Sequence, residues 1–297
     1  MNDFNWNTYI NNYEDLQKAG INTKKKAWKH WITYGQKEGR ILQNINTKTK
    51  IIIDKTYKNY EKIIKNKLLL IISCHSNSIF KYNVLKNNIK YLILNNIDII
   101  IINSIEFKNM YNFNISPNII KIFFVDNDKF CDFGKWVYVI KNFNYSNYKN
   151  IIFMNDSIIL INNINNYFIN IDNNEYDLYG FNDSKQIMYH YQSYIFSVKK
   201  SAIINFIKMV DDNKIFINKF NDLITYYEFG LYTSFITKSC FLQVSHLTCG
   251  RNLQFTADDI YITLLQKNIF PIIKVKRLDN TPVPEFIQYA LRKLKIN

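Results

Sequence analysis

The stretch that decides the fold is Ile151-Ile152-Phe153-Met154-Asn155-Asp156-Ser157, an apolar run that ends abruptly in three polar residues. A short apolar run before a polar turn is typical of a buried strand. In open sheets of parallel strands, ligands bind beside the carboxyl ends of the strands. Asn155 and Asp156 are therefore candidates for a site. Because Asn, Asp and Ser also favour ordinary turns, a structural turn remains the alternative.

Outward from this run, apolar segments alternate with segments of helical character. Strands are predicted at 68–73, 98–103, 119–125, 150–154, 177–181 and 191–198, and helices at 79–95 and 133–142. Strands that alternate with helices indicate a mainly parallel sheet with helices on both faces. The predicted fold class is therefore α/β.

Residues 1–42 form a separate predicted unit, and the 297 residues are enough for one large domain and one small one. Aromatic residues recur there at helical spacing, with Gly20 as a helix stop and Thr23 as an N-cap, so a helical hairpin is predicted. We expect it to pack or interact rather than to catalyse. Residues 43–66, rich in Lys, Asn and Thr, are the predicted linker, and residues 67–297 are the main domain.

The net charge of +14 has an unusual origin, because only four of the 38 basic residues are Arg. Lys is abundant together with Asn, Ile, Tyr and Phe, which all have AT-rich codons. Arg side chains that read bases or clamp phosphates are nearly absent. We therefore expect no nucleic-acid partner, although the positive field would attract an anionic ligand.

The four cysteines are scattered, with no C-x-x-C pair and no zinc spacing, so reduced thiols are expected. The N-terminal residues are polar and lack the apolar core of a signal peptide. No apolar run approaches the roughly 20 residues of a membrane-spanning helix. We expect a soluble protein without a membrane span.

Two polar residues lie at the borders of predicted elements. His75 follows the first strand of the main domain, on the side where a ligand would meet it and the amides of the next helix. The alternative for His75 is a hydrogen-bonded turn residue. Asp132 stands in Cys-Asp-Phe-Gly-Lys-Trp at 131–136, before a predicted helix. It is predicted to hold a ligand hydroxyl, to cap that helix, or to do both.

Three downstream segments add polar candidates. His190 and Gln192 project to the same face of an extended chain, where they suit hydroxyl or phosphate groups or bridge neighbouring strands. Glu228 lies near a predicted helix start, where a carboxylate is also favourable for purely electrostatic reasons. Lys274 ends Phe-Pro-Ile-Ile-Lys at 270–274, in which Pro271 ends a helix. Lys274 is either a contact for an anionic ligand or simply solvated.

In this order, these segments resemble the rhamnan synthesis protein F family of glycosyltransferases over about residues 67–285. The segments that carry the resemblance are 131–136, 154–157, 190–193, 227–231 and 270–274. Asp132-Phe133-Gly134 and Trp136 match a family pattern Asn-x-Gly-x-Asp-Phe-Gly with a following aromatic, but Asp128 and Phe130 stand where the pattern has Asn and Gly. The N-terminal hairpin resembles a small module of many bacterial and giant-virus glycosyltransferases.

The family resemblance implies a GT-A-like nucleotide-sugar-binding sheet and a hexosyltransferase activity. The donor would be a nucleotide diphosphate sugar, plausibly a deoxysugar such as rhamnose, and the acceptor a glycan. Glu228 would be the catalytic base, and Asp156 would organise the diphosphate, with or without a bound Mn²⁺ or Mg²⁺ ion. The other donor-binding residues implied are His75, Asp132, Trp136, Asn155, His190, Gln192 and Lys274.

A non-catalytic glycan-binding or scaffold protein that keeps the fold is the main alternative. The substitutions at Asp128 and Phe130 and the single carboxylate beside Asn155 favour it. A basic nucleic-acid-binding protein is a weaker alternative. The expected location is the cytoplasm, which would be the host cytoplasm if the chain is viral.

Overall fold

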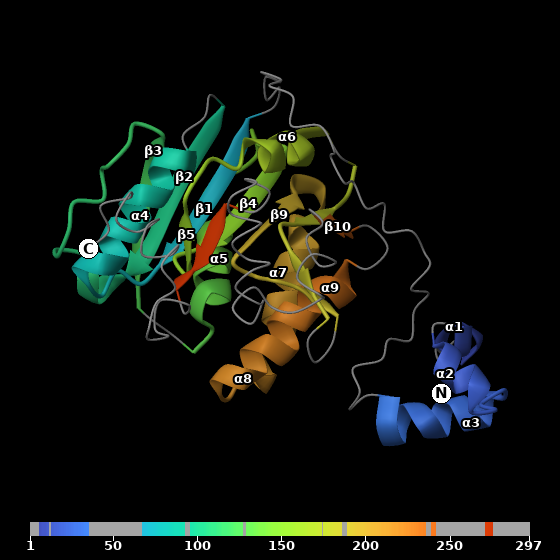
Figure 1. Ribbon diagram of the computed structural model, residues 1–297. Helices are drawn as coiled ribbons and strands as arrows, with labels where there is room; N and C mark the ends of the chain where they lie inside the picture. Colours follow the sequence, from blue (N-terminus) through green and yellow to red (C-terminus); the bar gives the residue numbers. More distant parts are fainter. Residues whose placement is uncertain are drawn as a thin grey trace, which may run out of the picture.

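A computed structural model describes residues 6–11, 13–35, 67–92, 96–126, 129–173, 175–185, 189–235, 239–241 and 271–275. Its centre is a seven-stranded sheet of order β10-β6-β9-β4-β1-β2-β3 (Figure 1). The strands are β1 (Leu68–Cys74), β2 (Ile97–Ser104), β3 (Ile119–Val125), β4 (Asn150–Asn155), β6 (Leu178–Gly180), β9 (Ile195–Lys199) and β10 (Ser239–Phe241). Neighbouring strands are parallel except at β9, which is antiparallel to both β4 and β6. The predicted α/β class and mainly parallel sheet are confirmed.

Two short antiparallel pairs lie beside the main sheet. The strands β5 (Ile158–Leu160) and β11 (Ile272–Lys274) form one pair, and β7 (Asp183–Ser184) and β8 (His190–Tyr191) form the other. The strand predicted at 191–198 is thus divided between β8 and β9. The reason is local, because the Gln192 N–H turns to the Asn182 carbonyl and the Ser193 hydroxyl bonds Glu228.

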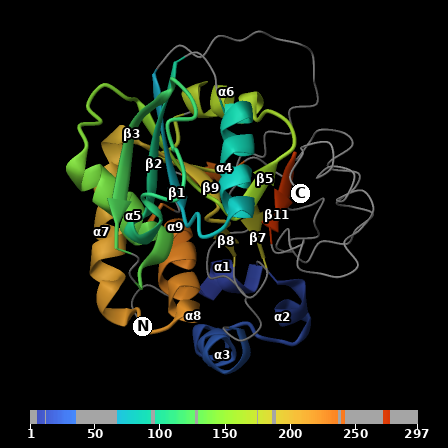
Figure 2. The ribbon, with the colours of Figure 1, turned by 90° about the vertical axis from the view of Figure 1, so that its left-hand side faces the viewer.

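Helices cover both faces of the sheet, as Figure 2 shows for α4 and α6 on one side and α7 on the other. The alternating side chains of β1 explain this arrangement. Leu70 and Ile72 belong to the core that packs against α4 and α6, whereas Leu69 and Ile71 belong to the core under α5 and α7. The helices are α4 (Ile79–Leu92), α5 (Cys131–Asn142), α6 (Asn165–Asn173), α7 (Ile203–Asn213), α8 (Phe220–Leu223) and α9 (Phe229–Ser234).

Short helical turns complete the described part of this domain. These turns are η2 (Ile105–Phe107), η3 (Lys200–Ala202), η4 (Lys214–Phe216) and the π-helical turn η5 (Ile224–Glu228). Among the helices of the described residues, none is long and apolar enough to cross a membrane. Ser78 caps α4, because its hydroxyl accepts the Lys81 N–H.

The N-terminal residues form a small helical unit with its own core of Tyr9, Ile10, Leu16 and Ala27. Its elements are α1 (Trp6–Asn11), α2 (Glu14–Lys18), α3 (Lys24–His30) and the π-helical turn η1 (Trp31–Gly35). The predicted Thr23 cap is confirmed, because its hydroxyl accepts the Lys26 N–H, and Gly20 has the positive φ of 71° expected at a helix stop. The linker predicted at 43–66, Asp128 and the helix expected before Pro271 lie outside the described residues.

Candidate active site

The carboxyl ends of β1 and β4 bring the central candidates together. The two strands are parallel neighbours in which Ser73 pairs with Asn155, so His75 and Asp156 follow side by side. The Asp156 Oδ2 atom accepts the backbone N–H of His75 at 2.9 Å. Its Oδ1 atom lies 3.3 Å from the ammonium of Lys81, which also donates to the Asp156 carbonyl at 3.2 Å. Asp156 is 8% exposed, so these bonds form in a largely dry environment that strengthens them.

Asp132 joins the two strand ends from the first turn of α5. Its carboxylate accepts the Ser73 hydroxyl at 2.6 Å and the Asn155 side-chain amide at 3.0 Å. Burial raises the pKa of the Asp132 carboxyl above its ordinary value, and the nearby Asp156 charge adds to the rise. Capping of the helix is not its role, because α5 begins at Cys131 and the side chain of Asp132 crosses to the sheet. Cys131 has a φ of 49°, a strained value of the kind that clusters at functional sites.

Asn155, Ser157 and Lys274 form the outer side of the same cluster. The Asn155 side-chain oxygen accepts both the Ser157 N–H at 3.1 Å and the Ser157 hydroxyl at 2.6 Å, which makes a tight polar turn. The Lys274 ammonium donates to that hydroxyl at 3.0 Å and lies 4.5 Å from the centre of the Tyr194 ring. Lys274 reaches this place because β11 pairs with β5, directly after the Asn155–Ser157 turn.

Two lysines of the cluster escaped the sequence analysis. Lys81 lies in the first turn of α4, and Lys135 lies one turn after Asp132 in α5. The buried Lys135 ammonium donates to the Cys74 carbonyl at 2.9 Å and to the Ser104 hydroxyl at 3.0 Å, and that hydroxyl also contacts the His75 ring. Their position near the start of a helix that follows a strand was an available signal. It was hidden because basic residues are so numerous in this chain.

Glu228 and the segment before β9 form a second group. The Ser193 hydroxyl donates to the Glu228 carboxylate at 2.6 Å. His190 and Gln192 are both buried, and their side-chain nitrogens lie 3.4 Å apart. Glu228 does not sit at a free helix start, because α8, η5 and α9 form one continuous helical run. The π-helical turn that ends at Glu228 is a type often found at functional sites.

The two groups are connected through residues 193 and 194. The Asn155 N–H donates to the Tyr194 carbonyl at 3.1 Å, one residue after Ser193. Glu228 is therefore connected to the Asn155–Ser157 turn through the two consecutive residues Ser193 and Tyr194.

Trp136 does not reach this edge. Its side chain is 0% exposed and packs against Phe153 and Phe196 at 5.6 and 5.4 Å between ring centres. Its indole N–H donates to the Met154 carbonyl at 3.3 Å. Because a fully enclosed side chain has no surface to offer a ligand, we remove Trp136 from the set of donor-binding candidates.

A second Asn-Asp-Ser string, Asn182–Ser184, was also missed. It lies just after β6, much as Asn155–Ser157 lies at the end of β4, and its three residues are all buried. The Asn182 carbonyl accepts the Gln192 N–H at 2.9 Å, so the string lies on the other side of the segment that leads into β9. The repetition of the three letters after two apolar runs was the signal that could have revealed it.

The cluster does not fit the divalent cation that the family resemblance allows at Asp156. Among the described residues, no group of three or more His, Cys, Asp or Glu side chains is placed to hold a metal ion. Both oxygens of the Asp156 carboxylate already accept hydrogen bonds, one of them from an ammonium group. Mg²⁺ and Mn²⁺ require oxygen ligands that face the ion rather than neighbouring cations.

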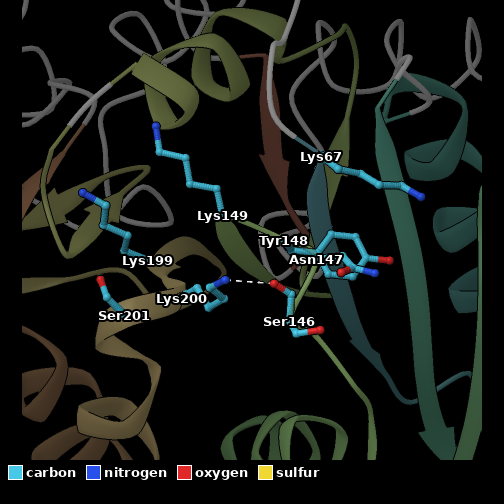
Figure 3. Close-up of a pocket in the computed structure, with 8 residues that line it drawn as sticks. All are labelled: Lys67, Ser146, Asn147, Tyr148, Lys149, Lys199, Lys200 and Ser201. Atoms are coloured by element: carbon cyan, nitrogen blue, oxygen red, sulfur yellow. Dashed lines mark hydrogen bonds between the residues drawn. The ribbon is translucent and has the colours of Figure 1, made fainter.

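An open cavity of about 370 Å³ lies at the opposite edge of the sheet (Figure 3). Lys67 and Lys149 line it directly before β1 and β4, so it faces the amino ends of these strands. Its lysines have protein partners: for example, Lys200 donates to the Ser146 carbonyl at 2.8 Å and Lys67 pairs with Asp98 at 2.7 Å. This cavity contains none of the candidate residues.

Comparison with known sequences does not indicate a function for the chain. No family model matches the chain. A curated protein, the DNA-directed RNA polymerase subunit beta'' of Plasmodium falciparum, is 33% identical over 154 residues, which cover 49% of this chain and 16% of that protein. Biased composition raises the identity between unrelated chains, and this chain is rich in Asn, Ile and Lys. We therefore take no function from this match.

Comparison with solved structures identifies the fold. The glycosyltransferase GlyE of Streptococcus pneumoniae TIGR4 superposes with a TM-score of 0.50 and 11% identity, over 78% of this chain and 62% of that chain. Its apo form gives a TM-score of 0.50 at 10% identity over the same shares. The galactosyltransferase LgtC in complex with donor and acceptor sugar analogs gives 0.38 at 10% identity, over 58% of this chain and 72% of that chain. The chain spans less than two thirds of GlyE, and it has the GT-A-like fold that the sequence predicts.

Proposed function

We propose that this chain is a glycosyltransferase that moves a sugar from a nucleotide diphosphate donor to a glycan acceptor. The observation that carries the proposal is the cluster at the carboxyl ends of β1 and β4. There Asp132, Asn155 and Asp156 are bonded to one another or to the same strand ends, with two ammonium groups beside them. In open α/β sheets this edge is where nucleotides bind.

The donor would lie across the cluster. Asp132, held by Ser73 and Asn155, would bind a hydroxyl of the ribose or of the sugar. The His75 side chain is 37% exposed, so it is accessible to a nucleotide, and its ring is oriented by Ser104. The residues do not fit a metal ion, so no step of the reaction is assigned to one.

Glu228 would act on the acceptor. The acceptor hydroxyl oxygen forms a bond to the anomeric carbon, and the bond from that carbon to the diphosphate breaks and leaves its electron pair on the diphosphate. The hydroxyl proton passes to Glu228. Ser193 fixes one oxygen of this carboxylate, and none of the described residues donates a hydrogen bond to the second oxygen. His190 and Gln192 are 2% and 6% exposed, so they would support the acceptor side by holding the segment before β9 in place.

A finer assignment rests on the resemblance of segments 131–136, 154–157 and 190–193 to the rhamnan synthesis protein F family. It favours a hexosyltransferase of polysaccharide synthesis with an activated deoxysugar such as rhamnose. The N-terminal unit would be an appendage with a packing or interaction role, joined to the catalytic domain through residues 43–66. A cytoplasmic location, in a host cell if the chain is viral, is part of the same proposal.

A donor panel tests the function. The full chain is incubated with UDP-, GDP-, CMP- and dTDP-sugars, with and without a glycan acceptor, and nucleotide release is measured. Glu228→Gln serves as the inactive control. Release of a nucleoside diphosphate from at least one donor, lost in the control, is the expected result. Binding to a glycan array without turnover of any donor would instead favour a scaffold protein.

A further inference from the structure

We propose that the ammonium groups of Lys81 and Lys274 take the place of a divalent cation, so that this chain binds the diphosphate of its donor without metal. The inference rests on the proposed function and adds to it how the diphosphate charge is neutralised. Lys81 was not among the residues predicted from the sequence. Lys274 was predicted to contact an anionic ligand, and it is now assigned to the diphosphate together with Lys81.

The first support is the state of the oxygen atoms in the Asn155–Ser157 turn. A metal site after this strand would draw its ligands from these oxygens. The side-chain oxygen of Asn155 accepts two hydrogen bonds from Ser157, and each Asp156 oxygen accepts one. The Asp156 carbonyl accepts the Lys81 ammonium, and the Ser157 carbonyl accepts the Val275 N–H. Each of these oxygens therefore already accepts at least one hydrogen bond from a protein donor, which reduces what it can offer to a metal ion.

The second support is the convergence of two lysines from remote parts of the chain. Lys81 is 75 residues from Asp156, and Lys274 is 117 residues from Ser157. Their ammonium groups bond two consecutive residues of one turn. Most lysines of a basic chain are solvated, but the side chain of Lys81 is only 24% exposed and the ammonium of Lys274 is placed over the Tyr194 ring. Such restraint is typical of a built cation site rather than of surface charge.

The third support is that the two lysines together carry the charge of a divalent cation. Two ammonium groups carry the same formal charge as Mg²⁺ or Mn²⁺, and lysine is an established phosphate ligand that acts as a point charge. The Asp156 carboxylate neutralises part of the Lys81 charge. However, an ammonium group has three donor hydrogens, and Lys81 donates only two of them to Asp156. The N-terminus of the 14-residue helix α4 adds positive potential at the same place.

The same charges suit the chemical step. When the bond between the anomeric carbon and the diphosphate oxygen breaks, its electron pair stays on the diphosphate, which gains one negative charge. Lys81 and Lys274 would stabilise that charge where a metal ion does so in other transferases. Asp156 then acts as a positioning residue that holds Lys81, not as a metal ligand.

Calorimetry on the full chain tests the absence of a metal requirement. The probes are inorganic pyrophosphate, UDP, GDP and dTDP, each titrated in EDTA and in MnCl₂. We expect pyrophosphate and at least one nucleotide to bind with affinities that differ less than about threefold between the two buffers. Binding that appears only with Mn²⁺ would overturn the inference and leave the proposed function intact. Absence of binding in both buffers would overturn both.

Variants test the two lysines. Lys81→Met and Lys274→Met should each weaken pyrophosphate binding about 10- to 100-fold, because each removes a charge-assisted contact. Lys200→Met, at the opposite edge of the sheet, removes the same charge and should leave the affinity unchanged. Equal weakening by all three would show a general charge effect and contradict the site.

A double variant shows whether Lys81 contacts the diphosphate directly or only neutralises the charge of Asp156. If Lys81 served only to neutralise Asp156, then Lys81→Met combined with Asp156→Asn would restore pyrophosphate binding. If Lys81 contacts the diphosphate, the double variant stays as weak as Lys81→Met, which is the expected result. Recovery to within about threefold of the wild type would overturn the role of Lys81.

Discussion

The two Asn-Asp-Ser strings, Asn155–Ser157 and Asn182–Ser184, are identical in sequence and equivalent in position. Phe153 and Gly180 both pair with Phe196 of β9, and each string begins two residues after its pair. Because β4 and β6 are both antiparallel to β9, they run in the same direction. Both strings therefore emerge at the same edge of the sheet, on the two sides of the segment that leads into β9.

Their surroundings differ in charge. Asp156 accepts the Lys81 ammonium and a backbone N–H, and Lys274 lies beside Ser157. Asp183 is 1% exposed and lies beside the Tyr189 hydroxyl, whose pKa is raised by burial and further by the Asp183 charge. The Asp156 carboxylate thus lies beside an ammonium group, and the Asp183 carboxylate lies beside a neutral phenol hydroxyl.

The difference teaches that three residues at a strand end do not define a site. Ammonium groups that arrive from α4 and β11 make the first string suitable for an anion. In the second string the buried Asp183 carboxylate lies beside the Tyr189 hydroxyl, a neighbour that suits a structural role. Four predictions test this contrast, beginning with Glu228, the carboxylate that accepts the Ser193 hydroxyl.

Glu228→Gln is expected to have the largest effect. Loss of a general base typically lowers turnover by about 10²- to 10⁴-fold, and the substitution nearly preserves the shape of the side chain. Initial rates of nucleotide release with donor and acceptor give the measurement. Thermal unfolding of the variant is the control, and full activity of a folded Glu228→Gln protein would remove Glu228 from the proposed mechanism.

Asp156→Asn should lower turnover by about 10- to 100-fold, because the amide no longer holds Lys81 by a charge-assisted hydrogen bond. The effect is expected in kcat more than in the KM for the acceptor, since the leaving-group charge grows in the transition state. Steady-state kinetics separate the two constants. A change confined to the acceptor KM would place Asp156 on the acceptor side instead.

Asp183→Asn is the matched change in the second string. It should lower the free energy of unfolding by about 1–3 kcal/mol, because an amide donor enters a buried position that now accepts a hydrogen bond. The affinity for pyrophosphate should not change. Urea unfolding and calorimetry check the two outcomes, and a loss of pyrophosphate affinity equal to that of Asp156→Asn would erase the distinction between the strings.

Asp132→Asn should change the pH dependence of stability, with the smallest effect of the four. Burial raises the pKa of Asp132 in the folded chain above its ordinary value of 3.8, so the folded state binds the proton more tightly than the unfolded state. The contribution of Asp132 to stability is therefore present at low pH and is lost as the pH rises through the raised pKa. Because Asn does not titrate, Asp132→Asn should reduce the slope of the unfolding free energy against pH by at most about 1.4 kcal/mol per pH unit.

Urea midpoints measured from about pH 4 upward compare the wild type with Asp132→Asn. The stability of the wild type should fall relative to the variant as the pH increases. A relative rise would mean that the hydrogen bonds from Ser73 and Asn155 outweigh burial and lower the pKa.

Local patterns predicted much of the fold. The strand at 119–125 has the predicted bounds, and Thr23 caps its helix as expected. These features depend on apolar periodicity and on single hydrogen bonds between near neighbours, which are encoded within a few residues. The sequence also predicted that Asp132, Asn155 and Asp156 lie at strand ends or helix starts near one edge.

Contacts between distant residues were beyond prediction. Trp136 fits a family motif, yet the packing of α5 on the sheet encloses it in the core. Asp is a residue type that often caps helices, yet the Asp132 side chain forms hydrogen bonds with Ser73 and Asn155, which are 59 and 23 residues away in the sequence.

The sequence by itself determined the α/β class, the strand that ends in Asn155-Asp156-Ser157 and the order of the polar segments, because these follow from local apolar patterns. Only the tertiary structure placed two ammonium groups beside the Asn155-Asp156-Ser157 string. Lys81 and Lys274 are two among many lysines, and they become neighbours through the packing of α4 and the pairing of β11 with β5. Charge acts through space over a few ångströms, whereas the sequence records only distance along the chain.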